Sequence, residues 1–309
     1  MSEIRREREG TGCIDGLFYE LLRPGAASPS AAADAPVLVA LPGFLSDGRQ
    51  IKRLLREVGR RCLTLDPLGS GRSDVPTDPE AYAWPRQVER LWRVLDHLRL
   101  DRVDVVGVSM GGMWLQHALL SAPERVEQAI LVATCAALSP RQRSILLGLQ
   151  ALWQAQVSRL DVWRVLAPLL FSVEFLERPS AIALLEMLAS DPRSHSAEAE
   201  EGRVVPLRQL AAMQAHDTRQ ALTDWAKAAA GRRPRCTVIG CELDILMSPS
   251  SQRELAGCLA APLHLLPTVG HTVWLEQPSL LADLLRRVLS AGPSAENHSS
   301  QLTAGAGSG

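Results

Sequence analysis

Apolar segments of strand length alternate with longer segments of helical periodicity along most of this 309-residue sequence. The first clear unit is the continuous apolar run 36–41, which Pro42 and Gly43 end. Residues 51–58 then carry apolar side chains at helical spacing, and residues 62–65 form a short apolar run. Continuous apolar runs fit strands that are buried on both faces, and their alternation with helices predicts parallel strands joined by crossovers. We therefore expect an α/β fold with a mostly parallel central sheet flanked by helices.

The same alternation continues to about residue 135. Apolar side chains repeat every three or four residues between Gln87 and Leu100, as in an amphipathic helix. A buried strand is predicted at Val103–Val108, a helix from Met110 to about Ser121, and a further strand at Val126–Thr134. These elements make up the first part of the predicted core, residues 1–135.

The strand pattern stops at about residue 138, and the chain is mainly helical to about residue 230. We interpret residues 136–230 as an inserted helical cap and residues 231–290 as the second part of the core. The Ser-, Gly- and Ala-rich residues 291–309 are predicted to be a disordered tail. The expected elements after the cap are a strand at Cys236–Gly240, a helix near Gln252–Leu259, a strand at Leu263–Leu266 and a helix at Ser279–Leu289.

A G-x-S-x-G sequence at residues 107–111 stands directly after a predicted buried strand and directly before a helix. That context makes Ser109 a candidate nucleophile, because small glycines permit a sharp turn that exposes the hydroxyl at the start of a helix. The helix dipole at that position favours the negative charge that develops during attack.

A serine nucleophile needs a general base, and three histidines follow the cap: His264, His271 and His298. His298 lies in the predicted tail, and His264 alternates within a strand. His271 follows Gly270 in the loop after the last strand, where an imidazole can reach the serine. We therefore expect His271 to be the base.

The acid of such a triad is expected after the preceding strand. Glu242 and Asp244 both follow the strand that ends at Gly240. We choose Asp244, whose loop leads into the next helix, and keep Glu242 as the alternative. The carboxylate holds the imidazole in the correct tautomer without taking its proton.

Two backbone N–H groups are candidates for stabilising the oxyanion of a tetrahedral intermediate. Met110 provides one, directly after the nucleophile. The second is assigned to Phe44, since Pro42 has no N–H and Gly43 lets the backbone approach closely.

Bulk composition favours a small-molecule substrate. The formal net charge is −1, which gives no reason to expect a nucleic-acid partner. No apolar run reaches the roughly 18 residues that span a bilayer, and the charged N-terminus is unlike a secretory signal, so cytoplasmic location is the default. His97, His117, His195 and His216 show no ligand spacing with Cys or carboxylates, so we expect no metal and no cofactor. The oligomeric state stays open.

Five segments of the chain, in order, resemble the α/β-hydrolase superfamily. They are LPGF at 41–44, DPLGSGRSD at 66–74, GVSMGG at 107–112, ELDILMSP at 242–249 and GHTVWLEQP at 270–278. The resemblance implies an α/β-hydrolase fold with the Ser, Asp and His triad, and within the superfamily the chain is most similar to carboxylesterases and enol-lactonases. Two positions depart from the common pattern: Pro42 replaces the usual His, and Cys241 replaces the usual Gly.

These observations favour a serine esterase or lactonase that acts on a small, apolar substrate through an acyl-serine intermediate. Trp153, Trp163 and Phe171, with Phe175, either line an apolar pocket over the serine or only pack the cap onto the core. The same triad also serves thioesterases, acyltransferases, haloperoxidases and C–C bond hydrolases. A receptor or regulator that keeps the triad but turns over slowly is the alternative outside enzymes.

Overall fold

The computed structural model describes residues 10–23, 35–190, 200–228 and 233–291. Within these residues, eight strands form one sheet in the order β1-β2-β4-β3-β5-β6-β7-β8. The pairings of β1 with β2 and of β2 with β4 are antiparallel, and all the others are parallel. The predicted mostly parallel sheet is therefore confirmed. The strands are β1 Thr11–Ile14, β2 Leu17–Leu22, β3 Leu38–Leu41, β4 Cys62–Leu65, β5 Val103–Val108, β6 Val126–Val132, β7 Arg235–Cys241 and β8 Leu263–Leu266.

The antiparallel hairpin β1–β2 is an element that the sequence analysis missed. Its turn is Asp15-Gly16, with φ of 51° and 80°, and these positive values are typical of a tight two-residue hairpin turn. Leu17 and Tyr19 on alternate positions are buried against the core. The Asp-Gly signal was present in the sequence, but the half-buried strands around it lack the continuous apolar runs of the central strands.

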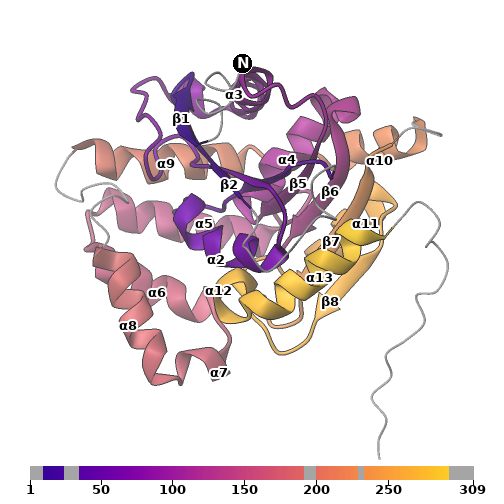
Figure 1. Cartoon of the computed structure of the whole chain (residues 1–309). Coiled ribbons are helices and arrows are strands. Elements are labelled where there is room, and N and C mark those ends of the chain that lie inside the picture. Colours follow the sequence, from indigo (N-terminus) through magenta and orange to yellow (C-terminus); the bar gives the residue numbers. More distant parts are fainter. Residues whose placement is uncertain (1–9, 24–34, 191–199, 229–232, 292–309) are drawn as a thin grey trace, which may run out of the picture.

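Helices cover both faces of the sheet (Figure 1). Along β3, Leu38 and Ala40 point into one apolar cluster while Val39 and Leu41 point into the other, which confirms that this strand is buried on both sides. The first cluster is covered by α2 (Gly48–Val58), α12 (Val273–Glu276) and α13 (Pro278–Ser290), and the second by α3 (Trp84–His97), α4 (Met110–Ser121) and α11 (Pro249–Leu259).

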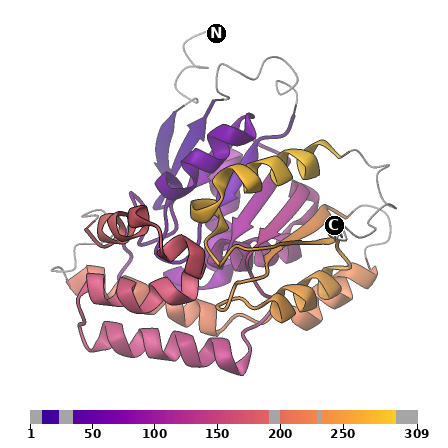
Figure 2. The same cartoon turned by 90° about the horizontal axis from the view of Figure 1, so that it is seen from below.

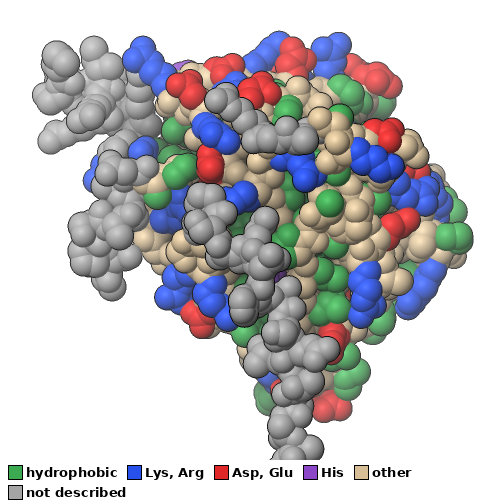
Figure 3. All heavy atoms as spheres, turned by 90° about the vertical axis from the view of Figure 1, so that its right-hand side faces the viewer, with side chains coloured by type: hydrophobic (Ala, Val, Ile, Leu, Met, Phe, Trp, Pro, Cys, Tyr) green, Lys and Arg blue, Asp and Glu red, His purple; other side chains and the backbone are tan. Residues whose placement is uncertain are grey.

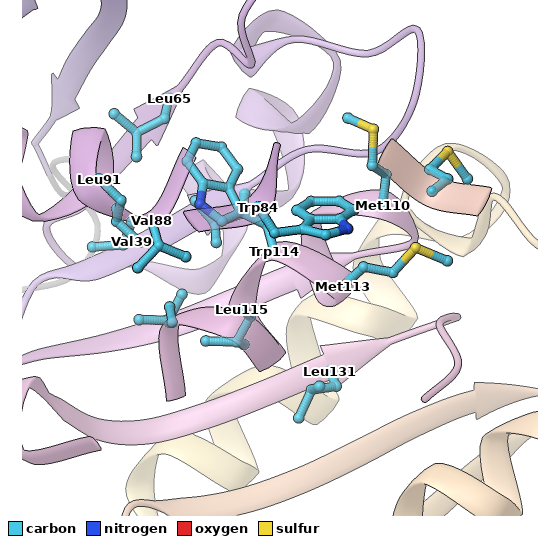
Figure 4. Close-up of a cluster of buried hydrophobic side chains, with 14 of the residues drawn as sticks. Val39, Leu65, Trp84, Val88, Leu91, Met110, Met113, Trp114, Leu115 and Leu131 are labelled. Carbon is cyan, nitrogen blue, oxygen red and sulfur yellow. The ribbon is translucent and has the colours of Figure 1, made fainter. Parts of the chain in front are cut away.

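Helix α4 is held in the larger of these two clusters by its own side chains. Met110, Met113 and Trp114 pack with Trp84 of α3 in a buried group above the strands (Figure 4). Met110 directly follows Ser109 in the sequence. The packing of Met110 in the core therefore holds the first residue of α4, and with it the position of the neighbouring Ser109.

Among the described residues between β6 and β7, six helices lie in the region predicted to be a cap. Figures 1 and 2 show α5 to α8 as one group at the side of the sheet. The backbone N–H of Thr218 donates to the carbonyl of Ala136 at 2.9 Å, so the chain enters and leaves this region at one point. Because α10 packs against α4 and α11, we use "helical insertion" below for α5 to α9. The six are α5 Pro140–Gln154, α6 Arg159–Leu170, α7 Val173–Leu176, α8 Pro179–Ser190, α9 Glu200–Gln214 and α10 Arg219–Ala228.

Some predicted helix ends differ from the observed ones by about three residues, whereas the helix predicted from Met110 to about Ser121 matches α4. The helix expected to reach Leu100 ends at His97, because Arg99 adopts a left-handed φ of 55°. Conversely, α11 begins at Pro249, ahead of the predicted Gln252. The predicted tail lies outside the described residues apart from Ala291.

No helix in the described ranges is long and apolar enough to cross a membrane. Acidic and basic side chains are intermingled on the face shown in Figure 3, in keeping with the net charge of −1.

Candidate active site

Ser109 occupies a sharp turn between β5 and α4. Its φ of 53° and ψ of −117° lie in a region that side-chain-bearing residues rarely adopt, which stores roughly 1–3 kcal/mol of strain. The surrounding backbone holds this conformation. The N–H of Ser109 donates to the carbonyl of Val132 at 2.9 Å, and its carbonyl accepts from the Thr134 hydroxyl at 2.8 Å and from the N–H of Gly112 at 2.9 Å.

Two glycines of the G-x-S-x-G sequence are required by close backbone contacts. A Cβ atom at Gly107 would lie 2.4 Å from the carbonyl oxygen of Gly111. One at Gly111 would lie 2.0 Å from the carbonyl oxygen of Leu41 on β3. Both distances are far below van der Waals contact, so the first turn of α4 can lie this close to the sheet only if residues 107 and 111 have no Cβ atom.

His271 lies in the loop after β8, and its Nε2 is 2.9 Å from the Ser109 hydroxyl oxygen. The imidazole is almost fully buried, and its ring meets the edge of Trp274 with centroids 5.8 Å apart. The loop after β8 thus places the imidazole next to a serine that lies 162 residues earlier in the sequence. His264, in contrast, is exposed on β8.

Asp244 completes a hydrogen-bonded chain with these two residues. Its Oδ2 is 2.8 Å from His271 Nδ1. Its Oδ1 accepts from the backbone N–H groups of Leu246 at 2.9 Å and Met247 at 2.7 Å. These donors stabilise negative charge on the carboxylate and fix its orientation. A carboxylate can only accept, so Nδ1 of His271 carries the hydrogen and Nε2 is left to accept from Ser109.

The alternative acid, Glu242, is exposed, and its backbone N–H continues the pairing with Leu266. The structure therefore brings Asp244, and not Glu242, to His271. The substitution of Cys241 for the usual glycine causes no strain, because this residue ends β7 and is not among those with positive φ.

Gln252 on α11 braces the acid loop and was missed by the sequence analysis. Its side-chain N–H group donates to Asp244 Oδ2 at 3.2 Å and to the Met247 carbonyl, and its oxygen accepts from the Cys241 N–H at 3.0 Å. The residue was predicted as part of a helix. Nothing in its local pattern indicates which loop it supports.

The backbone N–H groups of Met110 and Phe44 are the predicted oxyanion donors. The loop that carries Phe44 passes close to the serine, since a Cβ at Gly43 would be 3.3 Å from the Ser109 Cβ. Within the described residues, neither N–H group has an acceptor in the protein. Two free donors beside a nucleophile are what an oxyanion requires.

The predicted aromatic residues of the insertion occupy different surroundings. Trp153 is half-buried and meets the ring of Phe44 edge-on, with centroids 5.8 Å apart. Trp163 is buried in the cluster that also contains Met110. Phe171 stacks on Phe175 at 5.0 Å in a separate small cluster of the insertion. Trp153 is therefore placed beside the oxyanion loop, whereas Phe171 packs against its own helices.

Glu276 is a second buried polar residue that the sequence analysis missed. Its carboxylate accepts from the N–H of Gly270 at 3.1 Å, the N–H of Ser172 at 3.2 Å and the Ser172 hydroxyl at 2.6 Å. Burial raises the pKa of this carboxyl group, and the hydrogen bonds from Ser172 and Gly270 oppose that rise. The local signal was an acidic residue within the otherwise apolar segment Val273–Glu276.

No group of three or more His, Cys, Asp or Glu side chains among the described residues could hold a metal ion. His117 and His216 lie together, with Nε2 of the first 3.1 Å from Nδ1 of the second, but they form a hydrogen-bonded pair against Trp84. His97 is exposed, and His195 lies outside the described residues.

A buried Ser, His and Asp chain at the carboxyl edge of a mostly parallel α/β sheet defines a hydrolase class. The family model for the alpha/beta hydrolase fold matches residues 36–278. The chain belongs to this family, as its five sequence segments predicted.

A Bacillus subtilis (strain 168) protein provisionally named 2-succinyl-6-hydroxy-2,4-cyclohexadiene-1-carboxylate synthase is 26% identical over 287 residues, which cover 90% of this chain and 96% of that protein. Among solved structures, the alpha/beta hydrolase enzyme MGS-M2, from a Medee basin deep-sea metagenome library, is similar with a TM-score of 0.76 at 20% identity, covering 89% of this chain and 94% of its own. The enol-lactonase from Burkholderia xenovorans LB400 has a TM-score of 0.72 at 18% identity, over 91% and 100% of the two chains. At these identities the two structures show a shared fold.

Proposed function

We propose that this protein is a serine hydrolase that cleaves a carboxylic ester or lactone of a small, apolar substrate. The observation that carries the proposal is the continuous hydrogen-bonded chain from Ser109 through His271 to Asp244, at 2.9 Å and 2.8 Å. In such an arrangement the histidine removes the proton from the serine hydroxyl while the serine oxygen attacks a carbonyl carbon. The hydroxyl, which is otherwise a poor nucleophile, becomes an effective one.

In the first half-reaction, Ser109 attacks the carbonyl carbon while His271 Nε2 accepts its proton. Asp244 stabilises the resulting imidazolium through Nδ1. The N–H groups of Met110 and Phe44 donate to the oxyanion, and losing one such donor typically costs about 3–4 kcal/mol of transition-state stabilisation. The imidazolium then gives its proton to the leaving alcohol oxygen, and an acyl-serine remains.

In the second half-reaction, water attacks the acyl carbon. His271 takes a proton from this water and returns one to Ser109 as the acid leaves. Apart from the attacking water, side chains and backbone of the chain supply every group that these steps use. For a lactone, the leaving alcohol stays attached to the acyl group, so one open-chain product is released.

Trp153 supports an apolar substrate, because this half-buried ring contacts Phe44, which directly follows the residue that approaches Ser109. Trp163 and Phe171 already have packing partners in the protein, so their part in this proposal is to hold the insertion together and not to contact the substrate. The name of the enol-lactonase with the same fold is in keeping with ester or lactone chemistry. A cytoplasmic location belongs to the same proposal.

Labelling with a fluorophosphonate tests the proposed function. We expect the wild type to be labelled, Ser109→Ala to stay unlabelled, and the control Ser250→Ala, at an exposed serine, to label like the wild type. A panel of p-nitrophenyl esters of increasing acyl length, with lactones and thioesters, then ranks the substrates. Absence of labelling in the wild type contradicts the proposal. Labelling without turnover of any panel member favours the receptor alternative, and preference for thioesters favours a thioesterase.

A further inference from the structure

Glu276 joins the helical insertion to the loop that carries His271. One carboxylate oxygen accepts from the N–H of Gly270 at 3.1 Å and from the N–H of Ser172 at 3.2 Å. The other accepts from the Ser172 hydroxyl at 2.6 Å. Ser172 is the N-cap of α7 in the insertion, and Gly270 immediately precedes His271. A single carboxylate therefore contacts both segments.

A second connection lies on the other side of the histidine. The backbone N–H of Thr272 donates to the carbonyl of Leu170 at 3.0 Å, and the Thr272 hydroxyl donates to the same carbonyl at 3.1 Å. Thus Thr272, after His271, bonds directly to segment 170–172, where α6 ends and α7 begins, and Gly270, before it, is linked to this segment through Glu276. This leaves the backbone at His271 little freedom to move independently of the insertion.

The close approach of the two segments depends on Gly270. A Cβ there would lie 2.8 Å from both the Glu276 oxygen and the Ser172 nitrogen. The contacts are buried: Glu276 is 7% exposed and Ser172 is 4% exposed. Hydrogen bonds of a buried charged group are stronger than neutral ones and cost more to leave unmade. Glu276 is consequently well placed to fix the geometry of this junction.

We propose that Glu276 is a positioning residue, which holds His271 in line with Ser109 by tying the histidine loop to the α6–α7 junction of the insertion. The role rests on the proposed function, since it concerns the base of that reaction. It follows that a substrate that displaces α6 or α7 also displaces the base, so the insertion affects the rate of the chemical step as well as substrate binding.

The test uses the full-length protein and two readouts, the second-order rate constant of fluorophosphonate labelling and the kinetics of the best ester of the panel. Glu276→Ala is expected to label about 10- to 100-fold more slowly, the loss that a misplaced catalytic group typically produces. Its kcat falls while KM stays at the wild-type value. Glu276→Gln keeps an oxygen for both N–H groups and can donate to the Ser172 hydroxyl, so it restores labelling close to the wild-type rate.

Ser172→Ala removes the hydroxyl that donates to Glu276 and that also accepts from the Phe175 N–H at the start of α7. Its loss of labelling rate is expected to be smaller than that of Glu276→Ala, because the Glu276 carboxylate keeps both of its N–H donors. In the double variant, the serine change adds little to the effect of Glu276→Ala, because both act through one junction. Gln209→Ala is the matched control: Gln209 joins α9 to the Leu68 carbonyl and the Ser70 hydroxyl, away from the histidine loop. This control is expected to lower the melting temperature while labelling at the wild-type rate.

The outcomes separate this role from the proposed function. If the wild type is not labelled, the serine hydrolase proposal fails and this role fails with it. If the wild type is labelled, the positioning role is overturned by wild-type labelling of Glu276→Ala or by a folded Glu276→Gln as slow as the alanine variant. Should Glu276→Ala not fold, an unchanged rate in Ser172→Ala overturns it.

Discussion

The buried histidine pair should make the protein lose stability between pH 7 and pH 5. His216 is fully buried, and its Nε2 lies 3.1 Å from the carbonyl of Cys135, which can only accept. Nε2 therefore carries the hydrogen, and Nδ1 accepts from Nε2 of His117 at 3.1 Å. Trp84 stacks on the His117 ring with centroids 5.2 Å apart. A proton added to His216 Nδ1 would have to displace the hydrogen bond from His117, so the neutral forms are favoured.

The size and sign of the effect follow from the pKa values. Burial lowers the pKa of His117 from 6.5 to about 4 and that of His216 to about 3. Below pH 6.5 the unfolded chain binds these protons and the folded chain does not, so acidification favours unfolding. For each proton that only the unfolded chain binds, the free energy of unfolding falls by about 1.4 kcal/mol per pH unit. Between pH 6.5 and pH 5 the free energy of unfolding therefore falls by about 2 kcal/mol per histidine and by about 4 kcal/mol for the pair.

Urea unfolding at pH 7.0, 6.0 and 5.0 measures this effect, with tryptophan fluorescence as the probe. His216→Gln can keep one donor and one acceptor, and it removes one of the two titrating rings. The free energy of unfolding of this variant should fall less steeply with acid than that of the wild type. The difference between the two proteins should change by about 2 kcal/mol between pH 7 and pH 5. His97→Gln, at an exposed histidine, is the control and should run parallel to the wild type.

Buried carboxyl groups act in the opposite direction. Burial raises the pKa of Asp66, Asp104 and Glu276, so in the folded protein these groups take up protons more readily and offset part of the loss in acid. They are present in both proteins, and the comparison of wild type with His216→Gln cancels them. Parallel stability curves for these two proteins from pH 7 to pH 5 would refute the reasoning.

Three further predictions concern the active-site turn and the acid. Ser109→Gly and Ser109→Ala both lose the hydroxyl, but only glycine relieves the backbone strain, so urea unfolding should show Ser109→Gly to be more stable by about 1 kcal/mol; equal stabilities contradict this. Gly111→Ala should unfold the protein or destabilise it by more than about 3 kcal/mol, while Gly148→Ala, in open space on α5, should stabilise it by up to about 1 kcal/mol. Asp244→Asn should lower kcat by about 10⁴-fold, because the amide favours the wrong histidine tautomer. In ester hydrolysis assays Glu242→Gln should leave kcat unchanged, and a comparable loss in both variants would contradict the assignment.

Much of the fold and of the triad could be predicted because their signals are local. Ser109 was identified from a motif between a buried strand and a helix, and His271 and Asp244 from their places after the last two strands. The carboxyl ends of parallel strands lie at one edge of the sheet. The order of strands along the sequence was therefore enough to select three residues whose hydrogen-bonding atoms are 2.8 and 2.9 Å apart. The hairpin around Asp15-Gly16 was missed because its strands are only half-buried.

The supporting residues could not be predicted in the same way. Glu276 contacts Ser172 from 104 residues away, and that pairing exists only once the insertion has packed on the core. The contact between the rings of Phe44 in the core and Trp153 in the insertion likewise forms only when the two parts pack together. Side-chain contacts between segments with no shared pattern depend on tertiary packing, which hydrophobic periodicity does not encode.

The core and the insertion have different roles in the proposed reaction, and this difference affects how substrates are selected. Core elements make the contacts that shape the triad. These contacts are the strained turn at Ser109, the close backbone approaches at Gly107 and Gly111, and the hydrogen bonds that backbone N–H groups donate to Asp244. Residues of α5 to α9 make none of these contacts, so substitutions at their exposed positions can alter the insertion without removing them, in keeping with the many reactions that one fold can support. The insertion is nevertheless bonded to both triad loops: Glu276 bonds it to the loop of the base, and Gln142 of α5 donates to the Met247 sulfur in the acid loop at 3.2 Å. Sequence changes at the α6–α7 turn should therefore affect the rate of catalysis, whereas changes near Trp153 should chiefly affect which substrate is chosen.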